Sequence, residues 1–152
     1  MRLNGIIHES VGMCVSGGLS SLAVTGFLAE AGVETTAFVA DIGQAPREEI
    51  DALASSLEKA GLATVVIDLR DDMSEFALGL VYYQARYEGG YWNTTSGSRM
   101  VLVAGLAEAI KAAGCTALGH GCVGGGNDQR RFDRYTARIT PDLRVISPWT
   151  DQ

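Results

Sequence analysis

Lysine is nearly missing from this chain, since only Lys59 and Lys111 occur among its 152 residues. Lysine and arginine together number 12, against 18 aspartates and glutamates, so the net charge is −6. Proteins that hold duplex nucleic acid by its phosphates need a surplus of positive charge. We therefore expect no nucleic-acid partner.

Long apolar runs are also missing, and none approaches the roughly 20 residues that span a bilayer. The first five residues lack the apolar core of a signal peptide. The three cysteines form no C-x-x-C pair, and His8 and His120 lie far apart, which argues against a metal site. These features predict no membrane partner and a cytoplasmic protein with reduced thiols.

Proline is scarce, with three residues, whereas glycine is abundant, with 19. This imbalance indicates that the glycines serve tight turns rather than a flexible linker. Apolar residues make up 47% of the chain and charged residues 20%, as in globular proteins. At this length we expect one domain covering residues 1–152.

Short apolar runs alternate with helical patterns along the chain. Strands are expected at 11–15, 34–40, 63–67, 115–119 and 144–146, and helices at 20–31, 46–60, 71–87 and 99–113, with a loop at 88–97. This alternation predicts an α/β fold: a doubly wound parallel sheet of about five strands, with helices on both faces. The loops 16–21, 41–44 and 120–128 each follow a strand, so they should meet at one edge of the sheet.

The loop Ser16-Gly17-Gly18-Leu19-Ser20-Ser21 joins an expected strand to an expected helix. Its glycines allow close approach of an anion, and the helix N-terminus supplies N–H groups and partial positive charge. An equally plausible alternative is a tight turn in which Ser20 is the N-cap of the helix.

A second glycine-rich loop, 124–126, ends in Asn127 and Asp128, whose side chains can grip an amine or a hydroxyl. If the following segment is helical, Arg130, Arg134 and Arg138 form a stripe, and such stripes are usually solvated faces. Arg131 would then point elsewhere and could bind a carboxylate through its fork of N–H groups.

Tyr91, Thr95, Ser96 and Arg99 form a polar cluster in the sequence. The alternative to a binding role is a loop in which Ser96 caps the helix that begins at Arg99. His120 follows a strand and is more often structural than catalytic in such a position.

The chain also carries a series of ordered motifs. They are Ser16 to Leu22, Ala40-Asp41-Ile42-Gly43-Gln44, the Tyr-Glu-Gly that begins at Tyr87, Thr95-Ser96 with Arg99, His120 to Phe132, and Pro141 to Trp149. Together they resemble the N-terminal nucleotide-binding domain of the argininosuccinate synthase family, a PP-loop, adenine nucleotide alpha hydrolase-like fold related to the Rossmann fold.

The resemblance implies an ATP-dependent carbon–nitrogen ligase of arginine biosynthesis. ATP would adenylate a ureido- or carboxylate-type substrate, an amino acid amine would displace AMP, and pyrophosphate would be released. The implied cofactors are ATP and Mg²⁺. The enzyme would act by positioning and charge stabilisation, with small amino-acid-like molecules as its substrates.

The resemblance also implies site residues. Nucleotide would contact Cys14, Val15, Ser16, Gly17, Gly18, Leu19, Ser20, Ser21, Ala40 and Gly121. The substrates would contact Tyr91, Thr95, Ser96, Arg99, Asn127, Asp128 and Arg131. Catalytic roles would fall to Ser16, Asp128 and Arg131.

The chain departs from the family pattern at several contacts. Ser20 replaces an aspartate of the phosphate loop, Leu22 its final serine, Val123 a threonine and Gly125 a lysine. The family's larger second domain has no counterpart here, so we expect a partner chain that supplies it. An exposed apolar patch, and hence a homo-oligomer, should result.

Two alternatives remain beside the ligase. A catalytically degenerate ATP- or AMP-binding module would bind nucleotide without turnover and act as a regulatory or partner subunit. Another PP-loop ATP pyrophosphatase, such as a tRNA-modifying enzyme, is disfavoured by the low basic content and by the lack of a catalytic cysteine pair.

Overall fold

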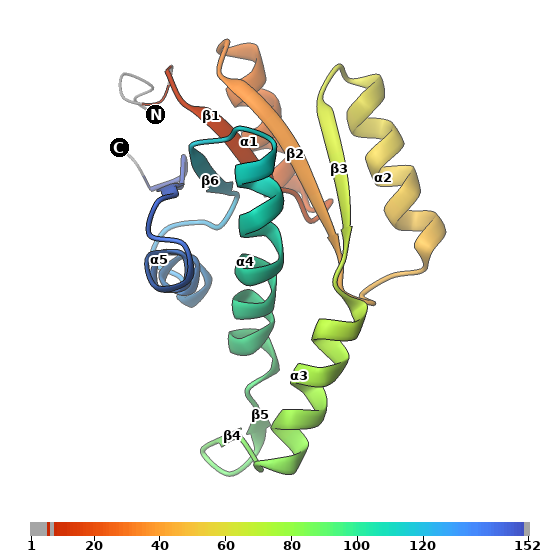
Figure 1. Cartoon of the computed structure of the whole chain (residues 1–152), viewed down its shortest axis with the longest axis vertical. Coiled ribbons are helices and arrows are strands. Elements are labelled where there is room, and N and C mark those ends of the chain that lie inside the picture. The colour runs from red at the N-terminus through yellow and green to blue at the C-terminus, as the bar shows by residue number, and fades with distance from the viewer. Residues whose placement is uncertain (1–5, 7, 151–152) are drawn as a thin grey trace.

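Five parallel strands form the central sheet of the protein (Figure 1). The structure, a computed structural model, describes Ile6 and residues 8–150. The strands are β1 (Ser10–Cys14), β2 (Glu34–Asp41), β3 (Ala63–Asp68), β6 (Ala117–His120) and β7 (Arg144–Ile146), in the order β3-β2-β1-β6-β7. The order reverses between β1 and β6, which places a crevice at the carboxyl ends of these two strands.

Helices cover both faces of the sheet. They are α1 (Leu19–Glu30), α2 (Arg47–Lys59), α3 (Arg70–Tyr82), α4 (Thr94–Ala112) and α5 (Asn127–Ile139). Successive residues of β2 point to opposite faces, as in any strand: Val39 packs with α1 and α2, and Phe38 with α4 and α5. The expected doubly wound α/β architecture is confirmed.

Two helix boundaries differ from the sequence prediction by more than one residue. α3 ends at Tyr82 instead of continuing to residue 87, and Gln84 beyond it has a positive φ of 51°. α4 begins at Thr94 instead of Arg99, because a side chain from α3 packs over its first turn: a Cβ on Gly97 would lie 1.6 Å from Cζ of Phe76. Threonine and glycine are weak helix formers, so local propensity does not favour this early start and the tertiary contact supports it.

A small antiparallel hairpin follows α3: β4 (Arg86–Tyr87) lies in the end of the expected helix 71–87, and β5 (Tyr91–Trp92) lies in the expected loop 88–97. Arg86 lies 4.0 Å above the ring of Trp92. Figure 1 shows this hairpin and the end of α3 extending away from the sheet. Within residues 6 and 8–150, no helix is long and apolar enough to cross a bilayer.

Candidate nucleotide and substrate site

The loop between β1 and α1 leaves the N-terminus of α1 open. The helix begins at Leu19, and its N-cap, Gly18, forms no side-chain capping bond. Ser20 is therefore the second residue of the helix, and the alternative prediction that it caps α1 is wrong. The first N–H groups of a helix have no intrahelical acceptor, and no acidic residue occupies this first turn. An anion is the natural partner for such a helix end.

The buried hydroxyl of Ser21 fixes the shape of the loop. It donates to the carbonyl oxygen of Gly18 at 2.9 Å and lies 3.3 Å from both the backbone nitrogen and the hydroxyl of Ser16. Gly17 has a φ of +77°, a conformation that residues with a side chain rarely adopt. The loop is thus held in shape without using the N–H groups at the start of the helix.

Gly121 allows the strand β6 to approach α1 closely. A Cβ at this position would lie 2.6 Å from Cα of Ser21, which is backbone and cannot move aside. Any side chain at 121 would therefore push the first turn of α1 away from the sheet. Gly121, in the loop after β6, is therefore needed to place the loop between β1 and α1.

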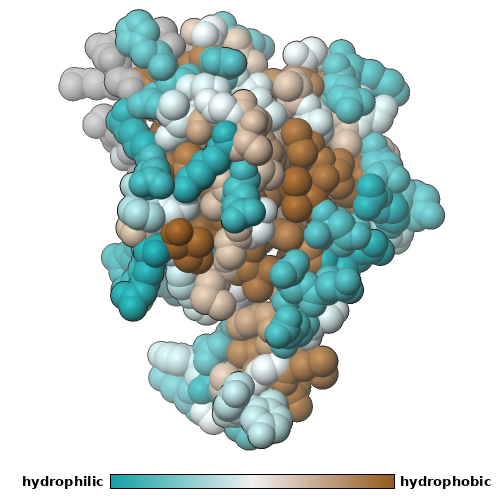
Figure 2. All heavy atoms as spheres, in the orientation of Figure 1, coloured by the Kyte–Doolittle hydropathy of each residue, from teal (hydrophilic) through white to brown (hydrophobic). Residues whose placement is uncertain are grey.

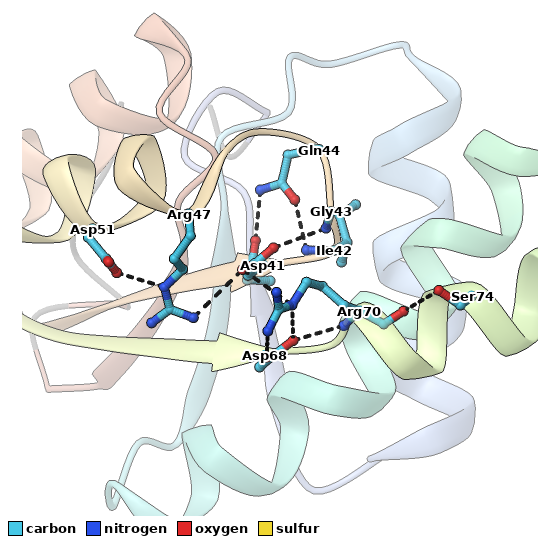
Figure 3. Close-up of polar contacts among 10 residues, drawn as sticks. Asp41, Ile42, Gly43, Gln44, Arg47, Asp51, Asp68, Arg70 and Ser74 are labelled. Atoms are coloured by element: carbon cyan, nitrogen blue, oxygen red, sulfur yellow. Dashed lines mark hydrogen bonds and ion pairs between the residues drawn. The ribbon is translucent and has the colours of Figure 1, made fainter.

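A buried carboxylate organises the turn after β2 (Figure 3). Asp41 accepts the N–H of Gly43 at 3.0 Å and lies 3.7 Å from both Arg47 and Arg70. The Gln44 side chain spans the turn, donating to the carbonyl of Ala40 at 2.9 Å and accepting from the N–H of Ile42 at 2.7 Å. This turn is rigid because its polar groups are satisfied locally.

The three loops meet around a cavity of about 520 Å³ at the carboxyl edge of the sheet, as predicted. Its lining residues are Cys14, Val15, Ser16, Gly18, Leu19, Ser20, Ser21, Ala40, Ile42, Gln44, Arg99, Leu102, His120, Gly121, Cys122 and Phe132. Of the residues expected to contact nucleotide, only Gly17 is not part of this lining. Arg99, expected among the substrate residues, lies here instead.

His120 forms part of this cavity but is almost fully buried. Its ring stacks on Phe132 with centroids 4.8 Å apart, and its Nδ1 accepts the N–H of Cys122 at 3.2 Å. Burial lowers the pKa of His120 to about 4, despite the nearby charge of Asp128. The imidazole is therefore neutral at pH 7, with the proton on Nε2.

Two thiols lie in the same cavity. Burial raises the pKa of Cys14 to about 12, and burial also raises the pKa of Cys122. The thiolate is the nucleophilic form of cysteine. Both side chains stay protonated at neutral pH, so neither is an activated nucleophile.

A second cavity, of about 530 Å³, lies between the β4–β5 hairpin, α4 and α5. It is lined by Tyr87, Tyr91, Asn93, Ser96, Asn127, Arg130, Arg131, Arg134 and Tyr135. We refer to it as the arginine cavity. Four of the expected substrate residues are present: Tyr91, Ser96, Asn127 and Arg131. Thr95 is not a lining residue, but its hydroxyl lies 2.5 Å from that of Tyr91.

Arg130 and Arg134 were expected on a solvated face, with Arg131 pointing elsewhere. Arg130 and Arg134 are exposed, as expected, but Arg131 does not point elsewhere, because all three side chains line the arginine cavity. Helical periodicity places Arg130 and Arg134 on one side of α5. It does not reveal that the hairpin lies beside that side of the helix and forms a cavity with it. Tyr135 was missed for the same reason.

Ser96 does not cap α4, because the helix begins at Thr94 and its N-cap, Asn93, forms no side-chain cap bond. The capping alternative for Ser96 is therefore wrong. Its hydroxyl lies 3.1 Å from the hydroxyl of Tyr135 on α5, so Ser96 faces the arginine cavity.

Asp128 joins the two cavities. Arg99 donates to its Oδ2 at 2.8 Å, and Arg131 donates to its Oδ1 at 2.6 Å. Burial raises the pKa of Asp128, but the hydrogen bonds and charges of Arg131 and Arg99 outweigh this effect and hold the pKa below its usual value. Asp128 is therefore ionised at neutral pH.

The cavity of about 520 Å³ at the sheet edge, called the nucleotide cavity after its expected ligand, offers hydroxyls and backbone N–H groups but contains no aspartate or glutamate among its lining residues. Within the described part of the chain, no group of three His, Cys, Asp or Glu side chains could hold a metal ion. Mg²⁺ prefers carboxylate oxygens, phosphates and water. The protein therefore provides partners for phosphate but no carboxylate ligand for Mg²⁺ in this cavity.

The open sheet, with glycine-rich loops and a helix N-terminus at its carboxyl edge, defines a nucleotide-binding α/β domain of the HUP class. A profile of the family described as "Arginosuccinate synthase N-terminal HUP domain" matches residues 10–152. The chain belongs to this family, whose members are ATP-dependent ligases.

The chain is 38% identical over 149 residues to the argininosuccinate synthase of Idiomarina loihiensis. It is 37% identical over 145 residues to the argininosuccinate synthase of Aliivibrio fischeri. In both cases 94% of this chain is aligned, but the chain spans only about 36% of the length of these relatives.

Solved structures share the fold. A predicted subunit of tRNA methyltransferase from Methanocaldococcus jannaschii superimposes with a TM-score of 0.56 at 16% identity, covering 93% of this chain and 68% of that chain. NMN synthetase from Francisella tularensis gives a TM-score of 0.57 at 13% identity, covering 76% of this chain and 46% of that chain. Identities this low support the architecture alone.

Proposed function

We propose that this domain binds ATP in the cavity at residues 14–21 and activates a small-molecule acceptor by adenylation, as part of a carbon–nitrogen ligase related to argininosuccinate synthase. The observation that carries the proposal is the open N-terminus of α1, which faces a cavity large enough for a nucleotide. Arginine biosynthesis in the cytoplasm is the corresponding cellular role.

In the proposed reaction, an oxygen of the acceptor forms a bond to the α-phosphorus of ATP, and the bond from that phosphorus to pyrophosphate breaks. An amino acid amine then bonds to the activated carbon, AMP leaves with the bonding electrons, and the amine loses a proton to solvent. The N–H groups at the start of α1 and the hydroxyl of Ser16 would stabilise the triphosphate charge, and Ala40 and Gly121 would line the adenosine subsite.

The arginine cavity would hold the acceptor, with Tyr91, Ser96 and Arg131 as direct contacts. Asn127 and Asp128, at the start of α5, would face the attacking amine. Asp128 also positions Arg99 and Arg131. Because the protein offers no carboxylate in the nucleotide cavity, Mg²⁺ would arrive bound to the phosphate oxygens of ATP.

Pyrophosphate release tests the ligase. The protein is incubated with ATP, Mg²⁺, L-citrulline or other ureido and carboxylate compounds, and amino acids, and pyrophosphate is measured. Pyrophosphate release that requires an acceptor, and that is lost when Ser16 is substituted, supports the ligase. ATP binding measured by calorimetry, without pyrophosphate release under any condition, supports the degenerate module.

A second domain, such as the relatives contain beyond the aligned 36% of their length, would complete the substrate site. We propose that a partner chain or a further domain supplies it, and that copies of this domain also associate with each other.

The self-association surface would be the outer side of α3. Leu78, Val81 and Tyr82 of α3 and its C-cap Tyr83 are all exposed, and Figure 2 shows apolar surface at this end of the molecule. A tyrosine side chain can bury roughly 150–250 Å², so this patch would supply part of the ~800 Å² per partner of a specific interface.

The charges of this surface are self-complementary. Asp72 and Glu75 lie in the first half of α3, and Arg86 follows its end. In an antiparallel pair of α3 helices, the acidic half of one copy would face Arg86 of the other.

A further inference from the structure

The arginine cavity is positively charged in an otherwise acidic protein. The net charge of the chain is −6, yet three of the nine lining residues are arginines and none is an aspartate or glutamate. The remaining lining side chains are tyrosines, asparagines and a serine, which are neutral hydrogen-bonding groups. A cavity of about 530 Å³ has the size of a small-molecule site.

The arginines are only partly compensated by the protein itself. The single charge of Asp128 is shared between Arg131 and Arg99, at 2.6 and 2.8 Å. Arg130 and Arg134 form no hydrogen bond or ion pair with the described residues, 6 and 8–150. Two exposed guanidinium groups therefore line the cavity without an ion-pair partner among the described residues.

The position of these arginines on α5 argues against a role in helix stability. Cations are unfavourable near the positive N-terminal end of a helix and favourable in its last turn. α5 begins at Asn127, so Arg130 and Arg131 lie near the unfavourable end. Arg138 lies in the last turn, where its charge stabilises the helix, and it does not line the cavity. A bound anion would remove the unfavourable charge at the N-terminal end.

The cavity also has a defined relation to the nucleotide site. Arg99 lines the nucleotide cavity, Arg131 lines the arginine cavity, and Asp128 binds both side chains. A ligand held by Arg130 and Arg134 would therefore lie next to the proposed ATP site, where an acceptor must lie.

We propose that the arginine cavity selects an acceptor with two or more negative groups, either a dicarboxylate or a carboxylate combined with a phosphate, and that Arg130 and Arg134 determine this preference. A zwitterionic monocarboxylate such as citrulline would satisfy one guanidinium and leave the other unpaired. The identity of this ligand as an acceptor rests on the proposed ligase function, whereas the preference for polyanions does not.

Calorimetry at low ionic strength, without ATP, tests the preference. The probes are glutarate and tricarballylate as polycarboxylates, inorganic phosphate, and L-citrulline. We expect at least one polyanion to bind tenfold or more tightly than L-citrulline, and the ratio of glutarate to phosphate affinity distinguishes the two ligand classes. Equal or tighter binding of L-citrulline would overturn the proposal.

Three matched variants locate the binding. Arg130→Gln and Arg134→Gln should each weaken the best polyanion about tenfold, while Arg138→Gln, on the same helix outside the cavity, should leave it unchanged. A similar loss in Arg138→Gln would show a general charge effect and contradict the proposal. Circular dichroism confirms that each variant is folded.

ATP titrations separate this inference from the proposed function. Arg134→Gln should leave ATP affinity unchanged, because Arg134 is not part of the nucleotide cavity. A parallel loss of ATP affinity would mean that the arginines bind ATP phosphates, which refutes the acceptor preference. If ATP fails to bind the native chain while polyanions bind as expected, the ligase proposal falls and the anion site stands.

Discussion

Arg99 on α4 and Asp128 on α5 are 29 residues apart in sequence, and the guanidinium donates to the carboxylate at 2.8 Å. Because Arg131 binds the other oxygen of the same carboxylate, this pair connects the nucleotide cavity to the arginine cavity. A charge change in one cavity must therefore be felt in the other.

Asp128→Asn should break this connection. The amide cannot compensate two guanidinium groups, so we expect a loss of about 1–3 kcal/mol in the free energy of unfolding, measured by urea denaturation. Asp142→Asn is the matched control, because Asp142 is 80% exposed and its ion pair with Lys111 should contribute little. Equal stability of the two variants would argue against a structural role for Asp128.

Ser20→Asp restores the acidic residue of the family's phosphate loop at the second position of α1. We expect weaker binding of ATP without Mg²⁺, because the carboxylate repels the triphosphate, and tighter binding with Mg²⁺, because the carboxylate supplies a metal ligand. Calorimetry with and without Mg²⁺ measures both effects. Ser20→Asn has a similar size and no charge, and it should show neither; unchanged affinities in Ser20→Asp would place the nucleotide elsewhere.

His120 should make the protein less stable in acid. The pKa of His120 is about 4 in the folded state, against an ordinary value of 6.5. Between these values the unfolded chain binds the extra proton, so stability falls as the pH is lowered from 6.5 to 4, by up to about 3 kcal/mol.

The His120→Gln variant should lose this part of the pH dependence, as measured by urea denaturation at pH 7 and pH 4.5. His8→Gln serves as the control, because His8 is exposed, and it should keep the slope of the native protein. If the free energy of unfolding of His120→Gln still falls with pH as steeply as that of the native protein, other groups cause the acid sensitivity.

Leu78→Glu tests the proposed self-association through α3. Light scattering should give at least a dimer mass for the native chain and a monomer mass for this variant, because a charge would be buried in the interface. Phe27→Glu changes another exposed apolar side chain, on α1, and should leave the dimer intact. A monomeric native chain at micromolar concentration would contradict the proposal.

The order of strands and helices could be predicted from local patterns. The apolar runs of β1, β2 and β3 and the glycines that follow α1, α2 and α4 are signals that the chain carries within a few residues. The loop proposed to bind nucleotide was recognisable for the same reason, since a glycine-rich turn between a strand and a helix is a local feature.

Other features could not be predicted in this way. The start of α4 depends on Phe76, which packs against Gly97 from another helix. The environment of Arg130 and Arg134 depends on a hairpin some forty residues earlier in the chain. The cap predicted at Ser20 failed because Gly18 can begin the helix without a side-chain bond.

The sequence by itself determined the architecture, the edge of the sheet at which ligands would bind and the conformation of the proposed phosphate loop, because these follow from periodicity and from the backbone freedom of glycine. Only the tertiary structure decided that Asp128 joins two cavities and that three arginines face one of them. Those properties arise from distances between helices, and a side chain's charge acquires its role from the groups that the fold brings within a few ångströms of it.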